Sequence, residues 1–140
     1  MKIFIDTNIL ISSALWPGSI PAKALDKASF PNNMCMTCEY NIHEMIDVCH
    51  RKFRGRLSLM YDFLSEVMAV LWVVPMPEDE DISERLIRDV KDRPVLRAAI
   101  NAGADILLTG DKDFLEADVK VPRIMSASEF LGLKQAAKYD

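Results

Sequence analysis

The chain has few of the residues that stabilise secreted or zinc-binding proteins. Only three of its 140 residues are cysteines and two are histidines. Three cysteines cannot all pair, which argues against a secreted disulfide framework. The sequence also lacks an apolar run of about 20 residues, the length that spans a bilayer, and any segment typical of a secretory signal. We therefore expect a cytoplasmic protein without a membrane segment.

An excess of basic charge is missing as well. The formal net charge is −4, whereas proteins that bind nucleic acid by bulk charge carry clustered Lys and Arg. This protein can handle RNA only if its basic residues are concentrated locally. Its excess acids would then serve another purpose, such as holding a metal ion.

The order of predicted elements indicates an α/β fold. Short apolar segments predict buried strands at 2–5, 34–37, 71–74, 105–109 and 119–124. Helices are predicted at 7–16, 21–30, 40–53, 57–70, 92–103 and 126–131, with a loop and a short helix over 78–90 and a turn over 110–113. Strands that alternate with helices pair in parallel. We expect one domain over residues 1–140, a three-layer α/β/α sandwich around a mainly parallel, Rossmann-like sheet.

Acidic residues gather at one edge of this predicted sheet. Asp6 follows the first strand directly, and Asp111 follows the strand that ends at Thr109. Asp92 begins the helix that leads into that same strand, and Glu44 lies early in the helix after the second strand. Open parallel sheets bind ligands beyond the carboxyl ends of their strands. The sequence therefore predicts four carboxylates at such a site.

Each acid alone also has an ordinary structural interpretation. Asp6 and Asp92 precede helices and would suit as N-caps, and Asp111 lies in a turn, where Asp is common. A helical wheel puts Glu44 opposite the apolar face of its helix, as for a solvated acid. Only the joint arrangement favours a functional site.

Four motifs occur in order along nearly the whole chain. They are Ile-Phe-Ile-Asp-Thr-Asn (3–8), a Glu early in the third helix, Asp92 before Pro-Val-Leu-Arg-Ala-Ala (94–99), and Gly-Ala-Asp-Ile-Leu-Leu-Thr-Gly-Asp-Lys-Asp-Phe-Leu (103–115). Together they resemble PIN-domain nucleases, in particular the toxin components of bacterial toxin–antitoxin systems. The chain departs from the common pattern at Cys38, where a serine often begins the third helix.

The resemblance implies a metal-dependent endoribonuclease that acts on an RNA substrate, with an antitoxin partner and a homodimeric state. It assigns Mg²⁺ or Mn²⁺ to Asp6, Glu44, Asp92 and Asp111 as catalytic residues, Asp113 as a fifth metal ligand, and Asn8, Ser12 and Thr109 as supporting polar side chains. All-oxygen sites suit these hard cations, which activate water and neutralise phosphate charge. Two carboxylates ~6 Å apart repel by roughly 3 kcal/mol at an effective dielectric near 20, which a cation relieves.

Basic residues near these acids are candidates for binding the RNA backbone. They are Arg51, Lys52, Arg54 and Arg56, in the basic run that follows the helix of Glu44, and Lys112 in the last motif. The run is equally typical of a soluble helix end.

Other functions remain open at this point. A PIN-like fold without activity would only bind RNA or protein. A receiver domain would need paired acids near the first strand's end, and a haloacid-dehalogenase-like phosphatase needs Asp-x-Asp where this chain has Asp6-Thr7-Asn8. Zinc binding by the cysteines is disfavoured, because Cys35 falls in a predicted buried strand and Cys49 on an apolar helix face.

Overall fold

A computed structural model describes residues 1–134 of the protein. Within them one five-stranded, all-parallel sheet has the strand order β3-β2-β1-β4-β5. The strands are β1 (Lys2–Ile5), β2 (Met34–Cys38), β3 (Trp72–Val74), β4 (Ile106–Leu108) and β5 (Arg123–Met125). The prediction of an α/β sandwich with a mainly parallel sheet is confirmed.

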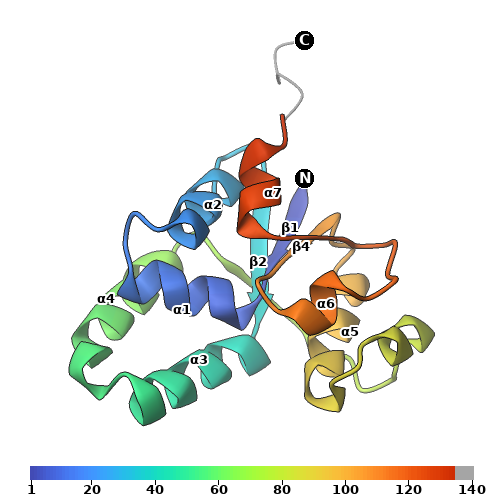
Figure 1. The fold of residues 1–140 in the computed structure, drawn as a ribbon, viewed down its shortest axis with the longest axis horizontal. Helices are drawn as coiled ribbons and strands as arrows, with labels where there is room; N and C mark the ends of the chain where they lie inside the picture. Colours follow the sequence, from blue (N-terminus) through green and yellow to red (C-terminus); the bar gives the residue numbers. More distant parts are fainter. Residues whose placement is uncertain (135–140) are drawn as a thin grey trace.

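Helices cover both faces of this sheet (Figure 1). One face carries α1 (Thr7–Leu15), α2 (Ile20–Ala28), α3 (Glu39–Lys52), α4 (Leu57–Val67) and α7 (Ala127–Gly132). The other carries α5 (Arg93–Asn101), α6 (Lys112–Leu115) and the 3-10 turn η2 (Ile82–Leu86); η3 (Val90–Asp92) leads into α5, and η1 (Arg54–Arg56) joins α3 to α4. In the described part of the chain, no helix has the length and apolar character required to cross a membrane.

The central strand is buried on both faces, which explains its unbroken apolar sequence. Ile3 and Ile5 pack into the core beneath α1, α2 and α4, whereas Phe4 packs into the core beneath α5 and α6. The neighbouring strand β4 divides in the same way, with Leu108 in the first core and Leu107 in the second. This alternation follows from the two-residue period of a strand.

The segment between β3 and α5 does not form the predicted helix. Its large apolar side chains Ile82, Leu86 and Val90 are exposed, so no apolar face holds a continuous helix against the core. Instead the carboxylate of Glu84, 2% exposed, accepts hydrogen bonds from Arg97 Nε and Nη2 at 2.9 and 2.7 Å. This buried ion pair fastens η2 to α5.

The last strand begins later than predicted. It starts at Arg123, because residues 120–122 form a turn and Pro122 cannot donate a ladder hydrogen bond. The sequence predicted a turn over residues 110–113. In the structure residues 112–115 form the short helix α6, because the Asp111 side chain caps it.

Removing the cation of the buried pair should destabilise the protein strongly. We expect Arg97→Met to lower the free energy of unfolding by about 3–5 kcal/mol, because the Glu84 carboxylate is then buried without its partner. Urea denaturation measures this loss. Arg85→Met, at an exposed position of the same segment, is the control, and a loss no larger than that of the control would contradict the prediction.

Candidate active site

Asp6 lies where the two central strands end. Strand order reverses here, since the chain continues from β1 to β2 on one side while β4 pairs on the other. Only 5% of Asp6 is exposed. Its Oδ1 accepts a hydrogen bond from Thr7 N at 2.8 Å, which caps α1, and its Oδ2 accepts one from Thr109 Oγ1 at 2.7 Å. The side chain therefore caps a helix and also faces the carboxyl edge of the sheet.

Asn8 and Thr109 connect Asp6 with the loop after β4. Asn8 Nδ2 donates to Asp6 Oδ2 at 3.2 Å, and Asn8 Oδ1 accepts from Gly110 N at 2.8 Å. Thr109 Oγ1 also accepts from Asp111 N at 3.0 Å. Both side chains thus lie beside the acids, whereas within residues 1–134 no hydrogen bond joins the Ser12 side chain to any of them.

A buried polar network fixes α3 against the end of β1. Asn41 Nδ2 donates to Ile5 O at 3.1 Å and to Thr37 Oγ1 at 3.2 Å, and Asn41 Oδ1 accepts from Thr7 Oγ1 at 3.0 Å. The network sets the position of α3, and with it Glu44, relative to Asp6.

Glu44 is half-buried, in contrast to the solvated position that the helical wheel indicated. The buried face of α3 consists of Asn41, Met45 and Cys49, and Glu44 lies next to it. Glu44 lines a hollow of about 300 Å³ with Tyr40, His43, Asp47, Val48 and Arg51. The helical wheel took Ile42 and Ile46 as the middle of the buried face, but both residues are only partly buried. For that reason the predicted position of Glu44 was wrong.

Burial raises the pKa of Asp6 to about 6. Hydrogen bonds from Thr109 and Thr7 oppose this shift, and the negative charges of Glu44 and Asp111 add to it. The two acids from other elements are therefore close enough for their charge to act on Asp6. This is the convergence that the sequence predicted.

Asp92 and Asp111 form a second close pair of acids. Burial raises the pKa of Asp92 to about 7, and both the charge of Asp111 and a hydrogen bond with it add to the shift. Asp92 has helical backbone angles, φ −88° and ψ −14°, and within residues 1–134 its side chain caps no helix. The capping interpretation is thus wrong for Asp92, whereas Asp111 caps α6 by accepting from Asp113 N at 2.9 Å.

The structure adds Asp89, which the sequence analysis missed. Asp89, Asp92 and Asp113 each offer a carboxylate oxygen, and these oxygens lie within 4.8 Å of one another. Asp89 also caps η3 by accepting from Lys91 N at 3.0 Å. Its one sequence signal was its position three residues before Asp92. We name these six residues the acidic group: Asp6, Glu44, Asp89, Asp92, Asp111 and Asp113.

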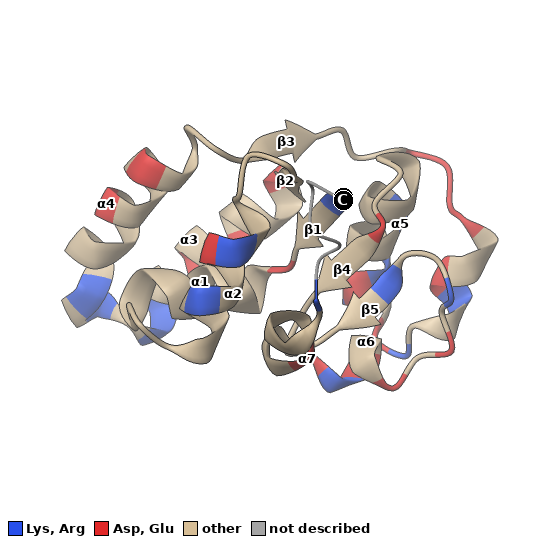
Figure 2. Ribbon diagram, turned by 90° about the horizontal axis from the view of Figure 1, so that it is seen from above, with Lys and Arg blue, Asp and Glu red and all other residues tan. Residues whose placement is uncertain are grey.

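The predicted basic residues have different surroundings. Arg51 lines the hollow beside Glu44. Arg54 Nε donates to His50 O at 3.1 Å, and Arg56 Nη1 donates to Leu15 O at 2.7 Å, so both help to hold the turn between α3 and α4. Lys52 and Lys112 are exposed. Figure 2 shows the basic turn between α3 and α4 apart from the acidic segment between β3 and α5.

Within residues 1–134, the group of side chains whose possible ligand atoms lie within 4.8 Å of one another contains no cysteine. Cys35, Cys38 and Cys49 are buried and free, and burial raises the pKa of Cys35 and of Cys38 to about 11. Cys38 begins α3 without a side-chain capping bond in the described part of the chain.

Comparison with known proteins identifies the family of the chain. Residues 2–113 match the family model of the PIN domain. The chain belongs to the PIN domain family. This membership favours a nuclease-type fold over the receiver and phosphatase alternatives.

Two further proteins resemble this PIN domain. An uncharacterized protein of Methanocaldococcus jannaschii is 27% identical over 119 residues, covering 82% of this chain and 74% of the relative. The crystal structure of VapBC2 from Rickettsia felis bound to a promoter DNA fragment contains a chain that superposes with a TM-score of 0.66 at 16% identity, covering 90% of this chain and 98% of that one. The second likeness supports the fold.

The residues of the acidic group fit a hard divalent cation. Every candidate ligand is a carboxylate, and oxygen ligands suit Mg²⁺ and Mn²⁺. Burial and, after it, the charges of neighbouring acids raise the pKa values of Asp6 and Asp92. A bound cation would favour the charged forms of both carboxylates.

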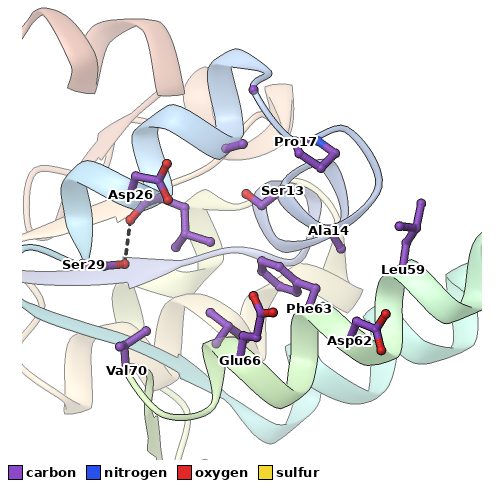
Figure 3. A pocket seen from close by; sticks show the side chains of 14 residues that line it. Ser13, Ala14, Pro17, Asp26, Ser29, Leu59, Asp62, Phe63, Glu66 and Val70 are labelled. Atoms are coloured by element: carbon purple, nitrogen blue, oxygen red, sulfur yellow. Dashed lines mark hydrogen bonds between the residues drawn. The ribbon is translucent and has the colours of Figure 1, made fainter.

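A larger hollow of the PIN domain lies elsewhere. It measures about 460 Å³ and lies among α1, α2 and α4, with Ala14 and Phe63 among its apolar side chains and Asp26, Asp62 and Glu66 at its polar positions (Figure 3). None of the acidic group lines it.

The metal-free PIN domain should lose stability as the pH rises. The folded protein holds protons on Asp6 and Asp92 up to about pH 6 and 7, whereas unfolded aspartate loses its proton near about pH 4. Stability is therefore greatest below the unfolded pKa and falls as the pH rises to the folded values. For Asp6 the part of this loss that lies above about pH 5 is about one pKa unit, or about 1.4 kcal/mol.

Urea unfolding in EDTA between about pH 5 and 8 measures this trend. Asp6→Asn should flatten the curve, because one of the two titrations is removed. Asp118→Asn, at an exposed carboxylate paired with Lys120, should leave it unchanged. A stability that increases with pH over this range would contradict the assignment.

Proposed function

We propose that this PIN domain, acting as one domain, is a Mg²⁺- or Mn²⁺-dependent endoribonuclease that hydrolyses RNA phosphodiester bonds as the toxin of a toxin–antitoxin pair. The observation that carries the proposal is the convergence of acids from four elements on the carboxyl ends of β1 and β4. Burial and the charges of Glu44 and Asp111 raise the pKa of Asp6 to about 6. Keeping such charges together costs stability, which a catalytic metal site explains.

The chain's own residues have distinct roles in this proposal. Asp6, Glu44, Asp92 and Asp111 would hold the metal. When bound, the metal supplies Lewis acidity and neutralises charge that develops on the phosphate. Thr109 orients Asp6 through the 2.7 Å hydrogen bond.

The support around these acids is a separate set of contacts. Asn8 links Asp6 to the loop of Asp111. The Asn41 network holds α3, so that Glu44 stays beside Asp6. Ser12 is a weaker candidate for support. Asp89 would be an additional oxygen ligand by position, since its carboxylate lies close to that of Asp92.

RNA cleavage tests the proposal directly. We expect the wild type to cut a structured RNA pool with Mg²⁺ or Mn²⁺ and to stop in EDTA. Asp6→Asn should lose at least about a hundredfold in rate, because a metal ligand contributes several kcal/mol to the transition state. Asp118→Asn, an exposed carboxylate outside the acidic group, should retain full activity.

Thermal unfolding with and without metal separates the alternatives. Metal should raise the melting temperature of the wild type more than that of Asp6→Asn. If the wild type is inert on RNA and still gains stability from metal, the protein is a catalytically silent binding module. If neither cleavage nor metal stabilisation occurs, the acids are helix caps and surface charges.

An antitoxin and a second copy of the chain are the proposed partners, with RNA in the cytoplasm as the substrate. The likeness to a chain of a VapBC2 structure supports the antitoxin, which would act by covering the acidic group. Light scattering of the protein alone, and mixed with the product of a neighbouring gene, tests both partners. If the protein alone has the mass of one chain, the homodimer is contradicted. If mixing with the product of the neighbouring gene leaves the mass unchanged, that product is not its antitoxin.

A further inference from the structure

One cation lies directly at the acidic group. Arg88 forms a two-pronged ion pair with Asp113, from Nε to Oδ1 at 2.9 Å and from Nη2 to Oδ2 at 3.1 Å. The Arg88 side chain is nevertheless 83% exposed, whereas that of Asp113 is 18% exposed. Asp113 therefore holds the guanidinium in one orientation while most of it faces solvent.

The geometry leaves Arg88 able to bind a second anion. A guanidinium has five N–H donors, and the pair with Asp113 uses one donor of each of two nitrogens. The remaining donors lie on the exposed part of the group. Planar guanidinium groups match phosphate with paired hydrogen bonds, and the RNA backbone is the phosphate that this site would meet.

Apart from Arg51, which lines the hollow beside Glu44, several other arginines are bound to neighbouring groups of the protein. Arg54 and Arg56 donate to main-chain carbonyls at the turn between α3 and α4. Arg97 is committed to the buried carboxylate of Glu84. Arg88 differs because its partner, Asp113, belongs to the acidic group itself.

A purely structural role explains Arg88 poorly. Exposed ion pairs add little to stability, and Arg88 lies in the segment between η2 and η3, which is held to α5 by Glu84 and Arg97 rather than by Arg88. A dense group of carboxylates also repels the RNA backbone, and a fixed cation at its edge would reduce that repulsion.

We propose that Arg88 binds a backbone phosphate of the RNA beside the acidic group, and that Asp113 is the positioning residue that orients it. The proposal rests on the proposed nuclease function. It also gives Asp113 a different role from the metal ligand that the sequence resemblance implied, because both its carboxylate oxygens bind Arg88.

The salt dependence of RNA binding tests Arg88. Fluorescence anisotropy of a labelled RNA with the cleavage-deficient Asp6→Asn protein, at fixed Mg²⁺ and increasing KCl, gives the slope of log Kd against log salt. Adding Arg88→Ala should reduce that slope by about 1, the value for one phosphate contact. Arg85→Ala, at an exposed arginine three residues earlier, should leave the slope unchanged.

Cleavage kinetics in the wild-type background test the orientation by Asp113. Arg88→Lys keeps the positive charge but loses the paired hydrogen bonds of the planar guanidinium. We therefore expect kcat/KM to fall by about tenfold, while the slope of log Kd against log salt stays the same. Asp113→Asn should lower kcat/KM to a similar extent, although it removes a negative charge from the site. If Asp113 only neutralised Arg88, the same variant would bind RNA more tightly and cut at least as well.

The outcomes separate this proposal from the nuclease itself. A wild type that cuts RNA, with Arg88→Ala matching Arg85→Ala in slope and in kcat/KM, would overturn the role of Arg88 alone. A wild type that neither binds nor cuts RNA would overturn both proposals.

Discussion

The hydrogen bond from Thr109 Oγ1 to Asp6 Oδ2 joins the ends of the two central strands, β1 and β4. The placement of the acids depends on the parallel pairing of these two strands. Because β1 and β4 run in parallel, both end at the same edge of the sheet. Asn8 extends the connection to the loop after β4, and the Thr109 hydroxyl also holds the main chain of Asp111. Residues from the two ends of the chain thereby reach one site.

Burial and like charge act together at this edge. Asp6 is nearly inaccessible and Asp92 is half-buried, so both charged forms are disfavoured, and each acid raises the pKa of its neighbours. A domain with about 5–15 kcal/mol of net stability carries such a group only if the apolar cores on the two faces of the sheet offset the cost. The same negative charge would give a divalent cation its affinity, so the cost in stability and the proposed function would have one origin.

The basic residues of this acidic protein have two kinds of surroundings. Arg97 compensates the buried Glu84 and fastens the segment between β3 and α5, while Arg56 ties the α3–α4 turn to the end of α1. Arg88 is held by a member of the acidic group and still faces solvent. A net charge of −4 is thus compatible with the proposed RNA binding, which needs only a few cations held in place.

The sequence alone determined the parallel α/β architecture and the positions of Asp6 and Asp111, because an apolar strand followed by an acid or by Thr-Gly-Asp is a local pattern. It could not determine that Asp92 has helical backbone and caps nothing, that Glu44 is half-buried, or that Asp89 joins the group. Nor did it single out the pair of Arg88 with Asp113. These features come from side chains far apart in sequence whose distances are set by strand pairing and by the Glu84–Arg97 contact. Only the tertiary structure determined these features. The periodicity of a sequence shows which residues share one face of a helix or strand, but it does not give the distance between two such elements.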